Sequence, residues 1–392
     1  MTVAERDGAR AYGVAEADVP PVLVVTNDFP PRVGGVQQYV WNVVRNLPPS
    51  RVSVLAPAWP GWQSHDAAQP FPVHRWPAGF VWPTADLARR VRSLASRYGA
   101  QVILFGHGFP LPAIGPGLTD AGLPYVVLTH GAEVWMARIP GLAGAMRRAW
   151  ADARAVTAIT RATANAIRPV LPGNVPLHLL HPAVDAERFS PDVDGSWVRQ
   201  RHGLEGRKVI LCVSRLVARK GQDVLIQGLP VVLRNEPTAS VLISGHGPDR
   251  PRLEALAAIA PEGSVVFAGP TPDHELPAYY AACDVFAMPC RSRWGGLEVE
   301  GFGIVFLEAA ASGKPVVAGR SGGVGEAVSD GETGLLVEGA EPKAVALALT
   351  RLLGDPELRA GMGRAGRARV EAGFTWSRRV AQLAAILDRA AS

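Results

Sequence analysis

The stretch GGLEVEGFGIVFLEAAASGKP, residues 295–315, joins a glycine-rich turn to an apolar helical run. Gly303 stands directly before the run, and Gly313 follows it where a helix would end. A short β-type segment, PVVAG, comes next at 315–319. Turn, helix and strand in this order form the repeating unit of a parallel sheet, so the stretch predicts an α/β fold.

Two acidic residues, Glu300 and Glu308, flank this turn. Free N–H groups at the start of the predicted helix, together with the helix dipole, favour binding of a diphosphate. Glu308, one turn into the helix, can accept hydrogen bonds from vicinal hydroxyls such as those of a ribose. Glu300 can do the same for a sugar. The alternative is a surface helix whose acids only favour its N-terminus, and the stretch alone leaves both interpretations open.

Short apolar runs alternate with helical stretches along the rest of the chain. Such alternation predicts doubly wound parallel sheets, with ligands bound beyond the carboxyl ends of the strands. The series breaks once, so we expect two Rossmann-like domains facing a central cleft. The predicted strands lie at 21–28, 51–57, 72–77, 101–107, 124–131, 153–160 and 176–185, and then at 209–216, 240–247, 264–270, 284–289, 315–319 and 334–338.

Composition shifts along the chain give four predicted segments. Residues 1–20 are polar and are expected to be a disordered lead. Residues 21–187 are expected to form an N-terminal Rossmann-like domain, and residues 188–372 a C-terminal Rossmann-like domain. Residues 373–392 are expected to be a closing helix that packs back toward the N-terminal domain.

The bulk composition narrows the class of protein. The chain has 392 residues, a formal charge of +5 and a pI near 9.4, which favours anionic partners without choosing among them. It has three cysteines without metal-like spacing, which indicates a reduced, cytoplasmic setting. No apolar run is long enough to span a bilayer, and no secretory signal core is present. We expect a soluble protein, or one that sits on a membrane face.

A basic loop, SRLVARKGQD (214–223), directly follows a predicted strand. Arg215 and Lys220 are five residues apart, and Gly221 closes a tight turn. Two cations beyond a strand end can neutralise a diphosphate leaving group. Solvated loop residues are the more frequent outcome for such a stretch taken alone.

In the first half, Gly34 and Gly35 lie where a strand meets a helix, and His130 follows another predicted strand in LTHGAEV. The glycines could cradle a phosphate, although a simple turn is the commoner explanation. A single histidine is more often structural than catalytic, but its place at a strand end favours a functional role.

Other motifs are rejected. GMGRAG (361–366) matches a dinucleotide fingerprint by its letters, but no strand precedes it and it lies in a basic helical segment. The acidic pair in DVD (192–194) belongs to the predicted linker. SGGVGEAVSDGETG (321–334) lacks the lysine of a P-loop. No Ser–His–Asp order or zinc pattern supports hydrolysis.

Taken together, the loops resemble those of retaining glycosyltransferases of family 4, which have the GT-B fold. The resemblance runs from about Pro21 to the C-terminus. It rests on the E-x7-E pair, on the basic loop 214–223, on the N-terminal glycine pair, and on DVFAMP, GIVFLEAAASGKPVVAG and GGVGEAV. Within that family, the sequence most resembles the phosphatidylinositol-mannoside mannosyltransferases that use GDP-mannose. LTHGAEVW departs slightly from the pattern expected of them.

The resemblance implies that 21–187 is the acceptor domain and 188–372 the nucleotide-sugar donor domain, and it implies roles for individual residues. Arg215 and Lys220 would neutralise the diphosphate, Glu308 would hold the ribose, and Glu300 would grip the transferred sugar. His130 would reach the sugar, so the implied catalytic residues are Arg215, Lys220, Glu300 and His130. The implied donor-binding residues are Gly34, Gly35, Arg215, Lys220, Gly303, Ile304, Val305, Glu308 and, near the base, Gly269.

It also implies a reaction. A nucleotide sugar, GDP-mannose, would give its hexose to a glycolipid acceptor by same-face attack, without a metal or other cofactor and without nucleic acid. A lipid acceptor implies contact with the inner face of the plasma membrane, for which 85–99 and 138–154 are basic, partly amphipathic candidates. These helices could equally pack their apolar sides on the sheet. The alternatives are a family 4 enzyme with another GDP- or UDP-sugar and a soluble acceptor, or a non-catalytic nucleotide-sugar binding protein.

Overall fold

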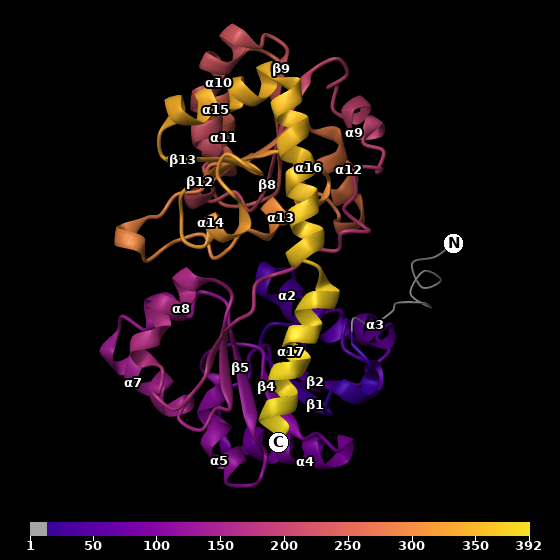
Figure 1. Cartoon of the computed structure of the whole chain (residues 1–392), viewed down its shortest axis with the longest axis vertical. Coiled ribbons are helices and arrows are strands. Elements are labelled where there is room, and N and C mark those ends of the chain that lie inside the picture. The colour runs from indigo at the N-terminus through magenta and orange to yellow at the C-terminus, as the bar shows by residue number, and fades with distance from the viewer. Residues whose placement is uncertain (1–13) are drawn as a thin grey trace. The chain divides into compact units, whose positions relative to one another are not determined.

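The computed structural model describes residues 14–392 and divides the chain into two compact units (Figure 1). One unit contains the chain up to Pro182 together with Trp376–Ser392, and the other contains Ala183–Thr375. These boundaries differ by three to five residues from the predicted ones. Of the predicted disordered lead, residues 1–13 lie outside the described residues. Its remainder differs from the prediction, since Glu16–Asp18 form a 3-10 helix and Val19 is buried.

The first unit is built on a seven-stranded parallel sheet in the order β3-β2-β1-β4-β5-β6-β7. Its strands are β1 (Val22–Val25), β2 (Val52–Pro57), β3 (Val73–Trp76), β4 (Val102–Phe105), β5 (Tyr125–Thr129), β6 (Ala155–Ala158) and β7 (Leu177–Leu179). Its helices are α2 (Gly35–Arg45), α3 (Trp62–Ala67), α4 (Ala85–Tyr98), α5 (Gly115–Thr119), α6 (Glu133–Met136), α7 (Pro140–Ala149), α8 (Arg161–Ile167) and α17 (Trp376–Ala391).

The second unit has a six-stranded parallel sheet in the order β10-β9-β8-β11-β12-β13. Its strands are β8 (Lys208–Val213), β9 (Ala239–Ser244), β10 (Val265–Gly269), β11 (Val285–Met288), β12 (Val316–Gly319) and β13 (Gly334–Val337). Its helices are α9 (Ser196–Arg201), α10 (Gln222–Asn235), α11 (Arg250–Ala257), α12 (Leu276–Ala282), α13 (Ile304–Ala311), α14 (Val324–Ala327), α15 (Pro342–Gly354) and α16 (Pro356–Gly373). The predicted fold class, two Rossmann-like α/β domains, is confirmed.

The strands β1 and β11, which lie inside the two sheets, are buried along their whole length. This requires helices on both faces, and it explains why these strands read as continuous apolar runs. In the first unit, one face packs against α4, α5, α7 and α8 through one buried cluster that includes Trp150 and Tyr125. The helix α17 lies on β4 and β5 and contacts α2, where Trp376 packs beside Tyr39 at 5.9 Å between ring centroids.

Both basic helices suggested for membrane contact use their apolar sides within the first unit. Leu87, Val91 and Leu94 of α4 belong to its buried cluster, and Met146 of α7 belongs to it too. The structure therefore favours the sheet-packing alternative for these apolar side chains. No helix within residues 14–392 combines the length and apolarity needed to cross a bilayer.

The rejected motif GMGRAG lies inside α16, where its glycines serve helix packing. A Cβ on Gly363 would lie 2.1 Å from the carbonyl oxygen of Gly313, and one on Gly366 would lie 3.2 Å from Cβ of Ala310. Close approach of α16 to α13 therefore needs glycine at 363. Rejecting the motif as a nucleotide fingerprint agrees with this arrangement.

We expect Gly363→Ala to destabilise the second unit by about 1–3 kcal/mol, because α16 must move away from Gly313. Gly361→Ala is the matched control, since no atom lies within 4 Å of its added Cβ and alanine is the better helix former. It should stabilise the unit by up to about 1 kcal/mol. Calorimetry of both variants measures the difference. Equal effects of the two substitutions would contradict the packing role of Gly363.

Candidate active site

Polar loops meet where each parallel sheet reverses its strand order. In the second unit the reversal lies between β8 and β11, because the chain leaves β8 toward β9 and β10 and returns to β11 on the other side. The loop after β8 carries Arg215 and Lys220, and the segment after β11 leads to Glu300. Open parallel sheets bind ligands at such points, so the predicted residues lie where a ligand would be held.

Glu300 is the centre of this arrangement. It is 7% exposed, and its Oε2 accepts from Lys220 Nζ at 2.7 Å and from Arg219 Nη1 at 2.6 Å. Its own N–H donates to Ser321 Oγ at 3.1 Å. Burial acts to raise the pKa of Glu300, but Lys220 and Arg219 outweigh it and lower the pKa. The carboxylate is therefore ionised at neutral pH, and in the described structure no hydrogen bond or ion pair reaches its Oε1.

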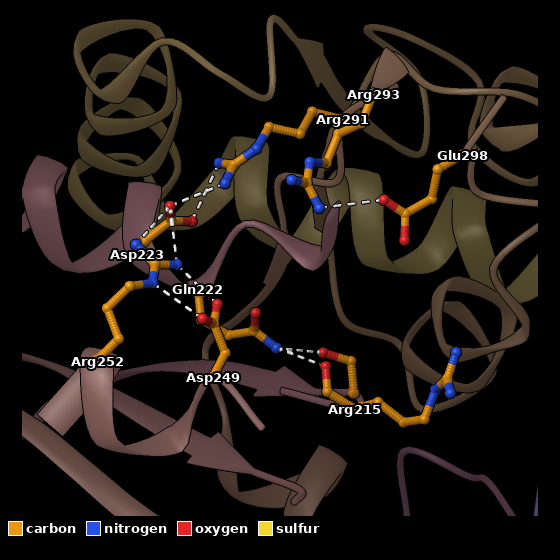
Figure 2. A network of polar contacts seen from close by, with 9 residues as sticks. Arg215, Gln222, Asp223, Asp249, Arg252, Arg291, Arg293 and Glu298 are labelled. Carbon is orange, nitrogen blue, oxygen red and sulfur yellow. Dashed lines mark hydrogen bonds and ion pairs between the residues drawn. The ribbon is translucent and has the colours of Figure 1, made fainter. Parts of the chain in front are cut away.

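Arg215 does not share this ion pair. Its side chain is exposed and makes no hydrogen bond or ion pair with any residue of the described range 14–392. Only its carbonyl oxygen is engaged, accepting from Gln222 Nε2 at 3.0 Å (Figure 2). An unpaired guanidinium beside a strand end is available to an anionic ligand.

Arg219, which the sequence analysis did not identify, contacts the Glu300 carboxylate together with Lys220. Both belong to the 3-10 helix Ala218–Lys220, and the left-handed Gly221 (φ +79°) then starts α10. A Cβ at Gly221 would lie 2.1 Å from the carbonyl oxygen of Pro289, so this close approach needs glycine. The adjacent basic residues Arg219 and Lys220 could have drawn attention to this position, but the sequence does not show which basic side chain points toward Glu300.

Ionic contacts tie the surrounding loops together (Figure 2). The carboxylate of Asp223 accepts from Arg291 Nη1 and Nη2 at 3.0 and 2.8 Å, which is a bidentate pair. Arg252 lies between Asp223 and Asp249 and is bidentate to the latter, at 2.9 and 2.6 Å. The segment after β11 is thereby attached to the start of α10 and to α11.

Gly303 begins α13 with a left-handed φ of +83°, and a Cβ there would collide with the Phe306 ring at 2.5 Å. No side chain caps this helix. The first N–H groups, among them those of Ile304 and Val305, therefore lack intrahelical partners and are available to a ligand. The predicted glycine turn and helix are present as expected, and their use by a ligand stays a prediction.

Glu308 lies one turn into α13 and is half-buried. Its Oε2 accepts from Tyr280 Oη at 2.6 Å. Burial raises the pKa of Glu308 to about 7, against the opposing effect of the Tyr280 hydrogen bond. Gly269, at the end of β10, has φ of +75° and open space around its Cα, and its carbonyl oxygen accepts from the Gly245 N–H at 2.8 Å.

In the first unit the strand order reverses between β1 and β4, and a second polar cluster occupies this place. Asp28 follows β1, His107 follows β4 and His130 follows β5. His107 Nε2 is 3.7 Å from Asp28 Oδ2, and its Nδ1 is 3.4 Å from Glu133 Oε1. His130 Nε2 lies 2.9 Å from the Gly106 carbonyl oxygen.

Glu133 organises this cluster and was also missed. It is fully buried and accepts N–H bonds from Gly108, His130 and Gly131, each at 3.0 Å. Burial opposes ionisation, yet the two histidines and the N–H donors lower the pKa of Glu133. Burial, followed by the charge on His107, lowers the pKa of His130. The available signal was a carboxylate three residues beyond His130 in LTHGAEV.

The glycine pair leads into α2 as predicted. Gly34 is extended (φ 169°), and a Cβ there would overlap Gln37 Oε1 at 2.1 Å. Gln37 Nε2 in turn donates to Asp28 Oδ1 at 2.5 Å. Gly35 has no atom within 4 Å of its added Cβ, so this turn is open. Within residues 14–392, no three His, Cys, Asp or Glu side chains are grouped as metal ligands.

Two family models cover most of the chain. The model described as Glycosyltransferase Family 4 matches residues 33–188, and that described as Glycosyl transferases group 1 matches residues 197–369. The interval between the two matches, residues 189–196, lies at the start of the second unit, shortly after its boundary at Ala183.

Relatives and solved structures agree with these matches. A GDP-mannose-dependent alpha-(1-6)-phosphatidylinositol monomannoside mannosyltransferase of Mycolicibacterium smegmatis is 42% identical over 374 residues, covering 94% of this chain and 98% of that protein. A corresponding monoacylated-acceptor enzyme of Corynebacterium glutamicum is 38% identical, covering 90% and 94%. Anabaena HepE in complex with UDP superimposes with a TM-score of 0.80 at 21% identity, covering 93% and 99%. The glycosyltransferase WaaG gives 0.68 at 18%, covering 92% and 99%.

We expect Glu133→Gln to destabilise the first unit by about 2–4 kcal/mol at neutral pH, because an amide cannot replace a buried carboxylate that accepts three N–H bonds. Hydrogen exchange at Gly108, His130 and Gly131 should accelerate. The difference from wild type should shrink in acid: a lowered pKa gives stability above the ordinary value of 4.5 that is lost as the pH falls through the native pKa.

Calorimetry with exchange measured by mass spectrometry tests this prediction. Glu16→Gln, in an exposed pair with Arg51, is the control and should change stability by less than about 1 kcal/mol. Unchanged exchange at the three N–H groups in the Glu133 variant would refute the organising role of this carboxylate.

Proposed function

The chain belongs to glycosyltransferase family 4, and from that membership we propose that it moves mannose from GDP-mannose to a phosphatidylinositol mannoside. The named activity of relatives that match it over almost its whole length supports this donor and this acceptor. The observation that carries the proposal is the buried Glu300 carboxylate, held by two cations with one oxygen left free, at the point where the second sheet reverses.

The second unit would bind the donor. The free guanidinium of Arg215 and the Nζ of Lys220 take the charge of the diphosphate, and the uncapped N–H groups of Gly303, Ile304 and Val305 bond its distal phosphate. Fixed cations in this position can stabilise the leaving group without a metal ion.

The sugar and the nucleoside would be held by the two glutamates. Glu300 Oε1 accepts from hydroxyls of the mannose, while Oε2 remains in an ion pair with a basic side chain. Glu308 accepts from the ribose hydroxyls, and the open backbone at Gly269 accommodates the base. A carboxylate and a hydroxyl pair are matched acceptor and donors.

The transfer itself would retain the configuration of the sugar. As the bond from C1 to the diphosphate oxygen breaks, the acceptor hydroxyl forms its bond to C1 on the same face, and its proton passes to the departing phosphate oxygen. Positioning and charge stabilisation then supply the catalysis. The contributions of Gly34, Gly35 and His130 to the sugar and the acceptor stay predictions. A lipid acceptor would bring the reaction to a membrane face.

A transfer assay tests the proposal directly. The full chain is supplied with GDP-mannose, UDP-glucose or UDP-N-acetylglucosamine, and with either phosphatidylinositol monomannoside in mixed micelles or a water-soluble mannoside. We expect a mannosylated lipid only with GDP-mannose, in the α configuration by NMR, and the same rate in excess EDTA. Turnover of a UDP-sugar, or of the soluble acceptor alone, would overturn the donor or the acceptor. Loss in EDTA with rescue by Mg²⁺ would overturn the metal-free route.

We expect Lys220→Met and Arg215→Met each to lower kcat by roughly 10²–10³-fold, because each removes a charge that stabilises the leaving group. Binding of GDP-mannose should persist, weakened by less than about tenfold. Lys343→Met, an exposed lysine of α15, is the control and should have wild-type kinetics. Stopped-flow binding and steady-state kinetics separate the two effects. Wild-type kcat in either active-site variant would exclude that residue from catalysis.

A further inference from the structure

Two cations share one oxygen of Glu300, although one of them is needed elsewhere. Lys220 Nζ and Arg219 Nη1 lie 2.7 and 2.6 Å from the same Oε2. Under the proposed function, Lys220 must place its charge on the donor diphosphate. A carboxylate this deeply buried cannot be left without a counter-charge when that happens, because an unpaired buried charge is strongly unfavourable.

We propose that Arg219 is a positioning residue that keeps Glu300 ionised and aimed at the sugar while Lys220 serves the diphosphate. This inference rests on the proposed function and deepens it. It assigns a third basic residue to the donor site, one that acts through Glu300 and touches no part of the substrate itself.

The attachment of Arg219 to its surroundings supports this role. Its carbonyl oxygen accepts from the Arg291 N–H at 2.9 Å, and the Arg291 side chain is bidentate to Asp223 (Figure 2). The Nε of Arg219 lies 3.8 Å from Glu298 Oε1. These contacts hold the guanidinium without any help from a ligand. Lys220 has a flexible stem that can turn its single charged group, whereas the planar fork of Arg219 is preorganised.

Of the ionisable groups around Glu300, Arg219 is the one that can remain its ion-pair partner when the donor binds. Lys220 and Arg219 approach from the 3-10 helix, Glu298 lies two residues earlier in the same segment, and the Cys290 thiol follows β11. Burial raises the pKa of Cys290 to about 12, so this thiol is neutral. With Lys220 engaged by phosphate, Arg219 is the cation that remains on Oε2.

The test compares Arg219→Met, Arg219→Lys and the control Arg320→Met, which removes an arginine from an exposed pair with Asp330. Comparing GDP with GDP-mannose separates an effect on nucleotide binding from an effect on the donor sugar. We expect Arg219→Met to keep the Kd of GDP within about threefold and to lose roughly 10–100-fold in kcat/KM for GDP-mannose. The pKa of Glu300, followed by carbon-13 NMR of its labelled carboxyl, should be higher in Arg219→Met than in wild type, since one cation lowers this pKa less than two do.

Arg219→Lys should return the pKa of Glu300 close to its wild-type position, and Arg320→Met should match wild type throughout. The direct NMR readout keeps Glu300 separate from Glu308, whose own pKa is about 7. Equal losses for GDP and GDP-mannose, or a Glu300 pKa that Arg219→Met leaves unchanged, would overturn the proposal. If wild type transfers no mannose, the proposed function fails first, and Arg219 is then tested by nucleotide against nucleotide-sugar binding with the donor that wild type does bind.

Discussion

A buried carboxylate held by two cations is the interaction on which the second unit depends. Glu300 can be ionised inside the protein only because Lys220 and Arg219 reach it, and they reach it only because the sheet reverses its order between β8 and β11. That reversal brings the loop after β8 against the segment after β11. Gly221, without a side chain, lets the two backbones come close enough for the ion pair to form. The ion pair of Glu300 therefore depends directly on the strand order of the sheet.

The first unit also stabilises a buried carboxylate, but with different partners. At its own reversal, between β1 and β4, the central charge is again a buried glutamate, but Glu133 is stabilised mainly by histidines and backbone N–H groups. Three N–H bonds on one carboxylate fix the backbone at Gly108, His130 and Gly131. The His130 imidazole is consequently oriented by the chain on both sides of it. In each unit, a buried carboxylate thus orders the loops that follow the central strands.

The sequence was informative where a pattern has one physical meaning. Continuous apolar runs predicted the strands because a parallel sheet is covered on both faces, and the glycine turn at 303 predicted the start of α13. It was less informative about side-chain direction. Arg215, Arg219 and Lys220 all look alike as letters, and only the 3-10 turn decides that the last two face Glu300 while Arg215 stays in solvent. Glu133 was missed because its significance comes from three backbone donors that no spacing rule reveals.

The position of α17 has a consequence for biogenesis. This helix follows the second unit in the chain, yet it covers β4 and β5 of the first unit and packs Trp376 beside Tyr39. A nascent chain on the ribosome therefore carries an incomplete N-terminal unit, with apolar surface still uncovered, until the whole second unit has been translated. A premature stop codon within the second unit would accordingly damage the half of the protein that was synthesised first.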